Sequence, residues 1–185
     1  MHRRRFLTLT LAATALPARA TTALHDALRG GGHVVYFRHA ATTWSGVDSI
    51  DWPRARQRLL SPQGIEDSRR IGAAWRANGL PVGEVLASPF ARCRDMAELA
   101  FGRVETRPEL LGLLSDADGR AARIAYLRDQ LAAVPPVGNR ILVSHRSNIA
   151  EVAGVALEEG EAVIVRPTGT AFEVLAQFMP QDWML

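Results

Sequence analysis

The chain has 185 residues, enough for one domain with a complete hydrophobic core. All 22 basic residues are arginine, which excludes Schiff-base chemistry and a phosphate-binding P-loop, since both need lysine. The single cysteine, Cys93, excludes an intrachain disulfide, and Leu99 stands where a cysteine-dependent phosphatase would need arginine.

The first 20 residues are typical of an export signal. Three arginines, Arg3 to Arg5, precede a short apolar stretch at 6–16, and an Ala-x-Ala pattern ends at Ala20. The stretch is too short for a membrane-spanning helix. We expect residues 1–20 to be removed and the rest to be periplasmic or secreted. The alternative is a cytoplasmic chain with an incidental basic start.

The export route stays open between two alternatives. Residues 3–7 are similar to a twin-arginine signal, and the general secretory route is the other candidate. Without the leader, 18 basic and 19 acidic residues remain, a net charge near −1. Nucleic-acid binding needs a basic face. We therefore expect no nucleic acid and no stably inserted membrane segment for the processed domain, residues 21–185.

A buried strand is predicted at Val34–Phe37. This apolar run is rich in β-branched and aromatic residues and follows three glycines at 30–32. It leads directly into Arg38 and His39. Ligands of open α/β sheets bind where strands end at their carboxyl edge. The position therefore indicates an active site, and the residue types indicate that it binds an anion.

A loop and a helix are predicted next. Residues 41–53 have no sustained hydrophobic period and favour a loop. Ser61 and Pro62 are typical of a helix start, with serine as the N-cap and proline in the first turn. The helix is expected to stop at Asn78–Gly79.

A second strand, predicted at 82–87, leads into another helix. Ser88 and Pro89 repeat the same start chemistry, which places Arg92 in the first turn of a helix ending at Gly102. Free backbone N–H groups in that turn favour an anion nearby. Arg92 is therefore a second candidate cation at the end of a strand.

The remaining chain predicts a third strand that delivers a basic residue. A short strand at 104–106 and an amphipathic helix at 121–133 precede a buried strand at 141–143. That strand leads into Ser144 and His145. Ser147 is expected to cap the following helix, and two final strands are expected at 162–165 and 171–178.

Three of these segments together resemble the histidine phosphatase superfamily, the phosphoglycerate-mutase-like and acid-phosphatase-like enzymes. The family's strand ending in Arg-His corresponds to 34–40, its Ser-Pro-x-x-Arg to 88–92, and its later strand with a second histidine to 141–145. The helix start at 60–64 is also similar to the family's Leu-Ser/Thr-x-x-Gly. The resemblance covers about residues 33–155.

The resemblance implies a three-layer α/β sandwich, with a mostly parallel sheet and helices on both faces. It implies a phosphatase for a small phosphomonoester or phosphoanhydride that uses neither metal nor other cofactor. His39 would attack phosphorus and carry a phosphohistidine intermediate. Arg38 and Arg92 would hold the phosphate, and His145 would stabilise the transferring group.

The family's loop after the first strand lines the phosphate pocket, so Thr42 and Ser45 are candidate substrate ligands. This chain departs from the family after each histidine, where glycine is usual. Ala40 follows the first histidine and Arg146 follows the second, adding a charged side chain beside the site.

The main departure from the family concerns the general acid. Many members carry a catalytic glutamate in a Leu-x-Glu pattern, but the aligned position here is Gly112. The nearest carboxylates are Glu109, Asp116 and Asp118. Asp116 is the first choice, because residues 115–119 are typical of a flexible loop.

Three other functions were weighed. A phosphate-binding or regulatory module without turnover is supported by the missing glutamate. A phosphomutase is disfavoured by the short chain and the leader. A zinc site is disfavoured because the five histidines lack short ligand spacing.

Overall fold

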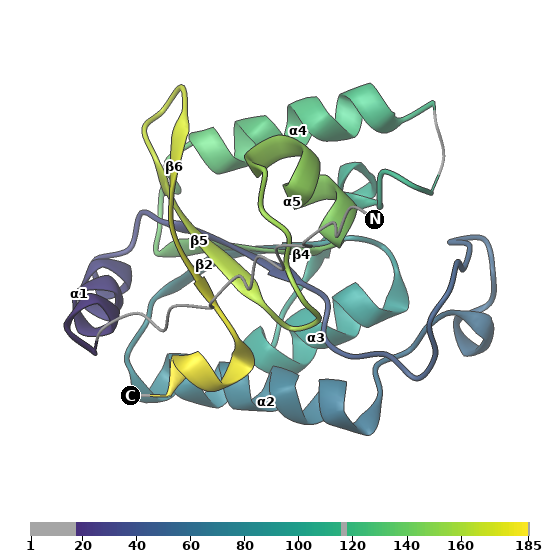
Figure 1. The fold of residues 1–185 in the computed structure, drawn as a ribbon, viewed down its shortest axis with the longest axis horizontal. Helices are drawn as coiled ribbons and strands as arrows, with labels where there is room; N and C mark the ends of the chain where they lie inside the picture. The colour runs from purple at the N-terminus through teal and green to yellow at the C-terminus, as the bar shows by residue number, and fades with distance from the viewer. Residues whose placement is uncertain (1–17, 116–117, 185) are drawn as a thin grey trace, which may run out of the picture.

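The computed structural model describes residues 18–115 and 118–184. Its centre is a six-stranded sheet in the order β3-β2-β4-β1-β5-β6 (Figure 1). The strands are β1 (Val34–Arg38), β2 (Val82–Ala87), β3 (Glu105–Thr106), β4 (Asn139–Ser144), β5 (Ala162–Pro167) and β6 (Phe172–Phe178).

Four strands are parallel and two are antiparallel. Strands β3, β2, β4 and β1 form the parallel part, and β5 pairs antiparallel with both β1 and β6. The predicted mostly parallel sheet is confirmed, and the strands expected at 34–37, 82–87 and 141–143 form its centre. A turn around Gly169 joins the two closing strands, which the sequence analysis expected at 162–165 and 171–178.

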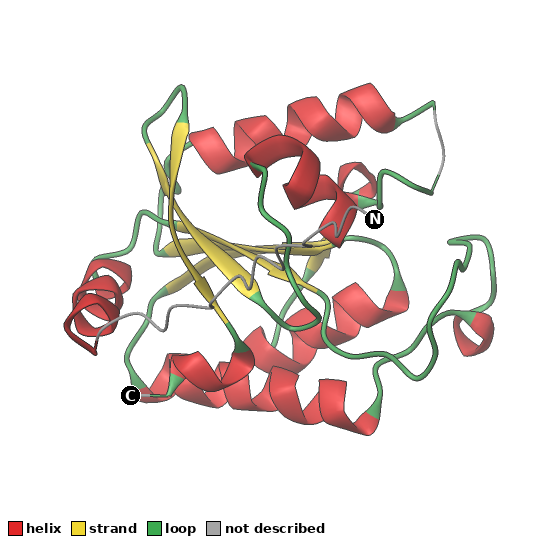
Figure 2. Cartoon of the chain, in the orientation of Figure 1, coloured by secondary structure: helices red, strands yellow, loops and turns green. Residues whose placement is uncertain are grey.

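Helices cover both faces of the sheet, which confirms the predicted three layers (Figure 2). In Figure 1, α2 and α3 lie on one face, and α4 and α5 lie on the other. The helices are α1 (Ala18–Arg29), α2 (Pro62–Ala77), α3 (Ala91–Phe101), α4 (Arg120–Ala132) and α5 (Arg146–Ala153).

The alternation of side chains along β1 divides the core in two. Val35 and Phe37 pack into the cluster formed with α2 and α3, which includes Trp75 and Met96. Val34 and Tyr36 pack into the cluster formed with α4 and α5. All four β1 side chains are fully buried, as expected for a strand covered on both faces. This burial fixes the strand that leads into His39.

One predicted helix cap is confirmed and two are wrong. The Ser61 hydroxyl accepts a hydrogen bond from Gly64 N at 3.1 Å and caps α2. Ser88 does not cap α3, whose Ala91 N–H instead donates to Gln57 Oε1 at 3.0 Å. Gln57 reaches the helix from a distant loop, so the local pattern could not reveal it.

Ser147 is also not a cap. Helix α5 begins two residues earlier than a Ser147 cap would place it, at Arg146, and His145 is its N-cap residue. The Ser147 hydroxyl accepts a hydrogen bond from Leu113 N at 3.2 Å. It therefore joins α5 to the loop that contains Gly112.

The expected leader lies mostly outside the described residues. Its last three residues, 18–20, belong to the first turn of α1. Within the part of the chain that the structure describes, no helix has the length and apolar character needed to cross a bilayer.

Candidate active site

The carboxyl ends of three parallel strands meet at one edge of the sheet. His39 follows β1, Ser88 follows β2 and His145 follows β4. The His39 N–H donates to Ser144 O at 3.0 Å, and the Ser88 N–H donates to Val143 O at 3.0 Å. The ladder therefore continues just past the strand ends and holds the two histidines at the same level.

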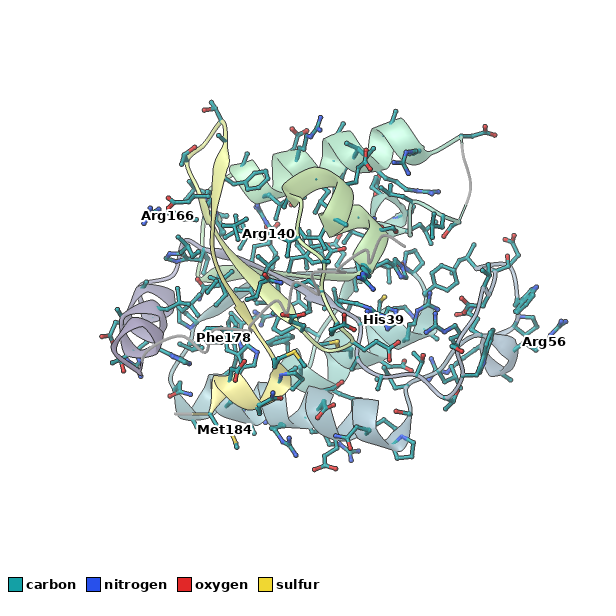
Figure 3. All side chains as sticks on the ribbon, in the orientation of Figure 1. His39, Arg56, Arg140, Arg166, Phe178 and Met184 are labelled. Atoms are coloured by element: carbon teal, nitrogen blue, oxygen red, sulfur yellow. The ribbon has the colours of Figure 1, made fainter. Side chains whose placement is uncertain are left out.

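A cavity of about 390 Å³ opens at this edge. Arg38, His39, Arg92 and His145 all line it, so the structure brings together the four residues predicted to be catalytic. Its volume lies near the lower end of the ~300–1,000 Å³ typical of small-molecule sites. Figure 3 shows His39 where the strands meet the following loops.

The His39 imidazole is buried and neutral. Only 4% of the residue is exposed, and Nδ1 donates to the Ala40 carbonyl at 3.0 Å. Because a carbonyl can only accept, Nδ1 carries the proton and Nε2 keeps a free lone pair. Burial, followed by the nearby Arg92 charge, lowers the pKa of His39 to about 3. Nε2 is thus unprotonated at neutral pH.

His145 faces His39, with 5.7 Å between the ring centroids. Its Nε2 lies 2.9 Å from the Ser88 hydroxyl. Tyr36 Oη donates to the His145 carbonyl at 2.7 Å and accepts from the His145 N–H at 3.1 Å. Burial first, and then the charge of Arg92, lowers the pKa of His145 well below its ordinary value.

Arg38 and Arg92 both line the cavity beside the histidines, and they are held by different neighbours. Arg38 donates to Leu157 O at 2.9 Å and forms an ion pair with Glu159 at 3.5 Å. Arg92 lies in the first turn of α3, as predicted, and stacks over the Phe90 ring at 4.2 Å. Among the described residues, the buried Nε atoms of both arginines lack a hydrogen-bond acceptor.

Two residues of the site, Asp48 and Glu159, were missed by the sequence analysis. Asp48, from the loop after β1, forms an ion pair with Arg92 at 2.9 Å, and both side chains are buried. Arg58 also lines the cavity and pairs with Glu159 at 3.2 Å. In the sequence, Arg54, Arg56 and Arg58 fit either a solvated stripe or recognition of an anionic part of the substrate. Asp48 and Glu159 gave no such signal, because their contacts join segments far apart in the chain.

The structure gives Thr42 and Ser45 other surroundings. Neither residue lines the cavity, and Ser45 is exposed. The Thr42 hydroxyl accepts from Arg58 at 2.7 Å and lies 3.4 Å from a Glu159 oxygen. The expectation that both hydroxyls face the phosphate is therefore replaced by a structural role for Thr42, which holds the Arg58 side chain.

Gly112, which stands where the family's glutamate is expected, lies beside the site. Gly112 lines the cavity, and a Cβ there would lie 3.4 Å from the His145 ring. Glu109 and Asp118 do not line the cavity, and Asp116 lies outside the described residues. Asp48 is the one carboxylate among the described cavity-lining residues, and it is already paired with Arg92.

Cys93 is a buried neighbour of the site. Its Sγ lies 3.9 Å from His145 Nε2, and burial raises the pKa of the thiol to about 12. The thiol therefore stays protonated and is a poor nucleophile. Across residues 18–115 and 118–184, no three His, Cys, Asp or Glu side chains are grouped to hold a metal ion.

Comparison with solved structures identifies the fold of the chain. No family model matches the chain, and no curated protein matches it significantly in sequence. Solved structures do match. The protein histidine phosphatase SixA complexed with tungstate shares 18% identity and a TM-score of 0.59, over 81% of this chain and 98% of that one.

Two further structures agree. A proposed phosphohistidine phosphatase SixA from Nakamurella multipartitia has 21% identity and a TM-score of 0.56, over 82% of this chain and 97% of that one. Phosphoserine phosphatase from Entamoeba histolytica, in complex with 3-phosphoglyceric acid, has 14% identity and a TM-score of 0.56, over 82% and 99%. The chain has a phosphoglycerate-mutase-like α/β fold. It is the fold of the histidine phosphatase superfamily, which the sequence motifs indicate.

The start of α2 fixes the segment after His39. Ser61 N donates to Ala41 O at 2.9 Å, and a Cβ on Gly64 would lie 2.1 Å from that oxygen. A Cβ on Gly72 would lie 2.1 Å from Ala100 O, on α3. Both glycines allow a close backbone contact, but only the Gly64 contact adjoins the candidate active site.

We predict that Gly64→Ala and Gly72→Ala each destabilise the fold by ~1–3 kcal/mol, because the added methyl group overpacks a backbone contact. Only Gly64→Ala should also weaken binding of an oxyanion such as tungstate, since it displaces the segment next to His39. Urea unfolding and isothermal titration would measure the two effects. Equal tungstate affinities for both variants would contradict this positioning role.

The lowered pKa of His39 predicts a loss of stability in acid. The unfolded chain binds a proton as the pH falls below ~6.5, whereas folded His39 stays neutral until about pH 3. Stability is therefore lost as the pH falls through that window. Between pH 7.5 and 5 the wild-type protein should lose about 2 kcal/mol more than His39→Asn. Equal losses in urea unfolding would refute this expectation.

Proposed function

We propose that the protein is a phosphatase that transfers the phosphoryl group of a small phosphomonoester or phosphoanhydride to His39 and then to water. The observation that carries the proposal is a buried, neutral imidazole with a free Nε2 in an arginine-lined cavity. A second neutral imidazole, His145, faces it. The fold shared with phosphatases of known structure supports the same reaction class.

The first step would form a covalent intermediate. The Nε2 lone pair of His39 attacks phosphorus, the bond to the leaving oxygen breaks, and that oxygen takes a proton from the surroundings. In the second step water attacks the phosphohistidine, the P–N bond breaks, and inorganic phosphate leaves. His39 returns to its neutral form with Nδ1–H still bound to Ala40 O.

The arginines supply the charge that phosphoryl transfer needs. The transition state spreads negative charge over three oxygens, and guanidinium groups match those oxygens geometrically. The buried Nε donors of Arg38 and Arg92 have no acceptor among the described residues, and a bound phosphate would offer acceptor oxygens at this site. We propose that this arginine cluster replaces a metal ion.

The Asp48–Arg92 pair sets a condition on binding. An incoming phosphate competes with the Asp48 carboxylate for Arg92, because both anions use the same donor. Asp48 is also the one carboxylate among the described cavity-lining residues, which makes it a candidate general acid once Arg92 has turned to the substrate. Aryl phosphates are suitable assay substrates for such a site, since their leaving groups need little protonation.

A phosphate-binding module without turnover is the second candidate. Gly112 in place of the family's glutamate favours it, and so does the carboxylate already bound to Arg92. Such a module would bind tungstate or phosphate through the same arginines. Turnover separates the two candidates, because only an enzyme releases phosphate in excess over its own concentration.

We predict that His39→Asn lowers kcat for 4-nitrophenyl phosphate at least ~10³-fold, since it removes the nucleophile. His33→Asn is the matched control. The Nδ1 of His33 also contacts a backbone carbonyl, that of Gly31 at 3.0 Å, but His33 lies before β1 and outside the cavity. Both variants should unfold at similar urea concentrations.

Rapid alkaline quenching and mass spectrometry of the wild-type protein should place the phosphoryl group on the His39 peptide. Added EDTA should leave the rate unchanged. A wild-type protein that binds tungstate without turnover would support the inactive module. Full activity in His39→Asn would overturn the proposed mechanism.

We also propose that the enzyme acts outside the cytoplasm. The support is the basic head, the short apolar stretch and the Ala-x-Ala pattern of residues 1–20. The exported protein should begin at or near Thr21, and sequencing of its N-terminus would show this. Recovery of an active exported form that begins with Met1 would contradict processing.

A further inference from the structure

Four arginines line the cavity, and their partners differ. Arg38 and Arg58 share Glu159, and Arg92 is paired with Asp48. Arg146 is exposed, and within the described ranges its guanidinium has neither an ion pair nor a hydrogen bond. It is therefore the one cavity arginine whose charge is left for an external anion.

Arg146 stands at a fixed place relative to the reacting atoms. It is the first residue of α5 and follows His145, whose backbone N–H donates to Tyr36 Oη at 3.1 Å. The next residue, Ser147, accepts a hydrogen bond from Leu113 N at 3.2 Å. The backbone is held on both sides, while the side chain remains open to the cavity.

The charge of Arg146 also acts on Arg38, the arginine that precedes the nucleophile. Burial lowers the pKa of Arg38, and the charge of Arg146 acts in the same direction, against the attraction of Glu159 and Glu158. Two guanidinium groups that repel each other at one cavity are relieved by an anion between or beside them.

The leaving group must pass this residue. Phosphoryl transfer places the attacking and leaving atoms roughly in line. His39 lies at the closed base of the cavity with 4% exposure, so the leaving group points toward the open side. Of the six exposed residues that line the cavity, Arg146 is the only charged one, and Val47 (84% exposed) and Leu114 (83% exposed) are the large apolar ones; the others are Gly46, Ser115 and Ala150. The leaving group thus meets one cation between two apolar side chains.

We propose that Arg146 binds a second anionic group on the leaving part of the substrate, a carboxylate or a further phosphate. The inference rests on the proposed function, because it takes His39 as the nucleophile that orients the substrate. It narrows the substrate class to small phosphate esters that carry another negative charge, with an apolar portion suited to Val47 and Leu114. Arginine suits this role because its planar fork binds carboxylate and phosphate with two hydrogen bonds.

The test uses phosphonates, which bind without turnover. Three benzylphosphonates carry a 4-carboxylate, a 4-carboxamide or a second phosphonomethyl group in the 4-position. Isothermal titration of the wild-type protein should show about tenfold tighter binding of the carboxylate than of the nearly isosteric carboxamide, the effect of one charge-assisted hydrogen bond. Preference for the bisphosphonate over the carboxylate would identify the second anion as a phosphate.

The variant Arg146→Gln should bind the carboxylate and the carboxamide equally, with little change for the carboxamide. Arg56→Gln is the matched control. It removes the same charge from an exposed arginine that stacks on Trp52 at 4.9 Å and lies outside the cavity, and Figure 3 shows it far from His39. This variant should keep the tenfold preference.

Three results would overturn the proposal. The wild-type protein could bind the carboxylate and carboxamide equally, or bind neither compound. Arg146→Gln could keep the preference of the wild type. Alternatively, it could weaken all three phosphonates by the same factor, which would assign Arg146 to the reacting phosphate. Failure of the proposed function is distinguishable, because a protein without turnover of 4-nitrophenyl phosphate could still show the full preference in binding.

Discussion

The parallel pairing of β1 with β4 is the constraint on which the site depends. Its register sets Arg38 opposite Ser144, so the residue after each strand is a histidine at the same edge. The His39 N–H continues the ladder to Ser144 O, and Tyr36 ties the His145 backbone to β1. A one-residue slip would reverse the faces of β1 and separate the two imidazoles. Core packing and site geometry therefore depend on one register.

Electrostatics explains why burial and charge can coexist at this edge. Four arginines that line one cavity repel one another, and two carboxylates, Asp48 and Glu159, offset part of that repulsion. The histidines respond differently, because they lose their protons and remain neutral. The resting site thus keeps its nucleophile unprotonated while its positive charge is only partly compensated.

Much of this arrangement could be predicted from the sequence. Apolar runs located the central strands, and the residues following them identified His39 and His145. Arg92 was also placed, although Ser88 turned out to contact His145 instead of capping α3. Asp48 and Glu159 escaped prediction because their roles come from contacts across 44 residues for Asp48 and 101 or more residues for Glu159. Local patterns carry no information about such partners.

The buried thiol of Cys93 has a consequence for where the protein can fold. As the only cysteine, and fully buried, it offers neither a partner for a disulfide nor a surface for mixed-disulfide formation. Oxidising and reducing compartments differ chiefly in their effect on accessible thiols. The described fold is therefore insensitive to redox poise, and its formation calls for no disulfide oxidant or disulfide isomerase on either side of a membrane.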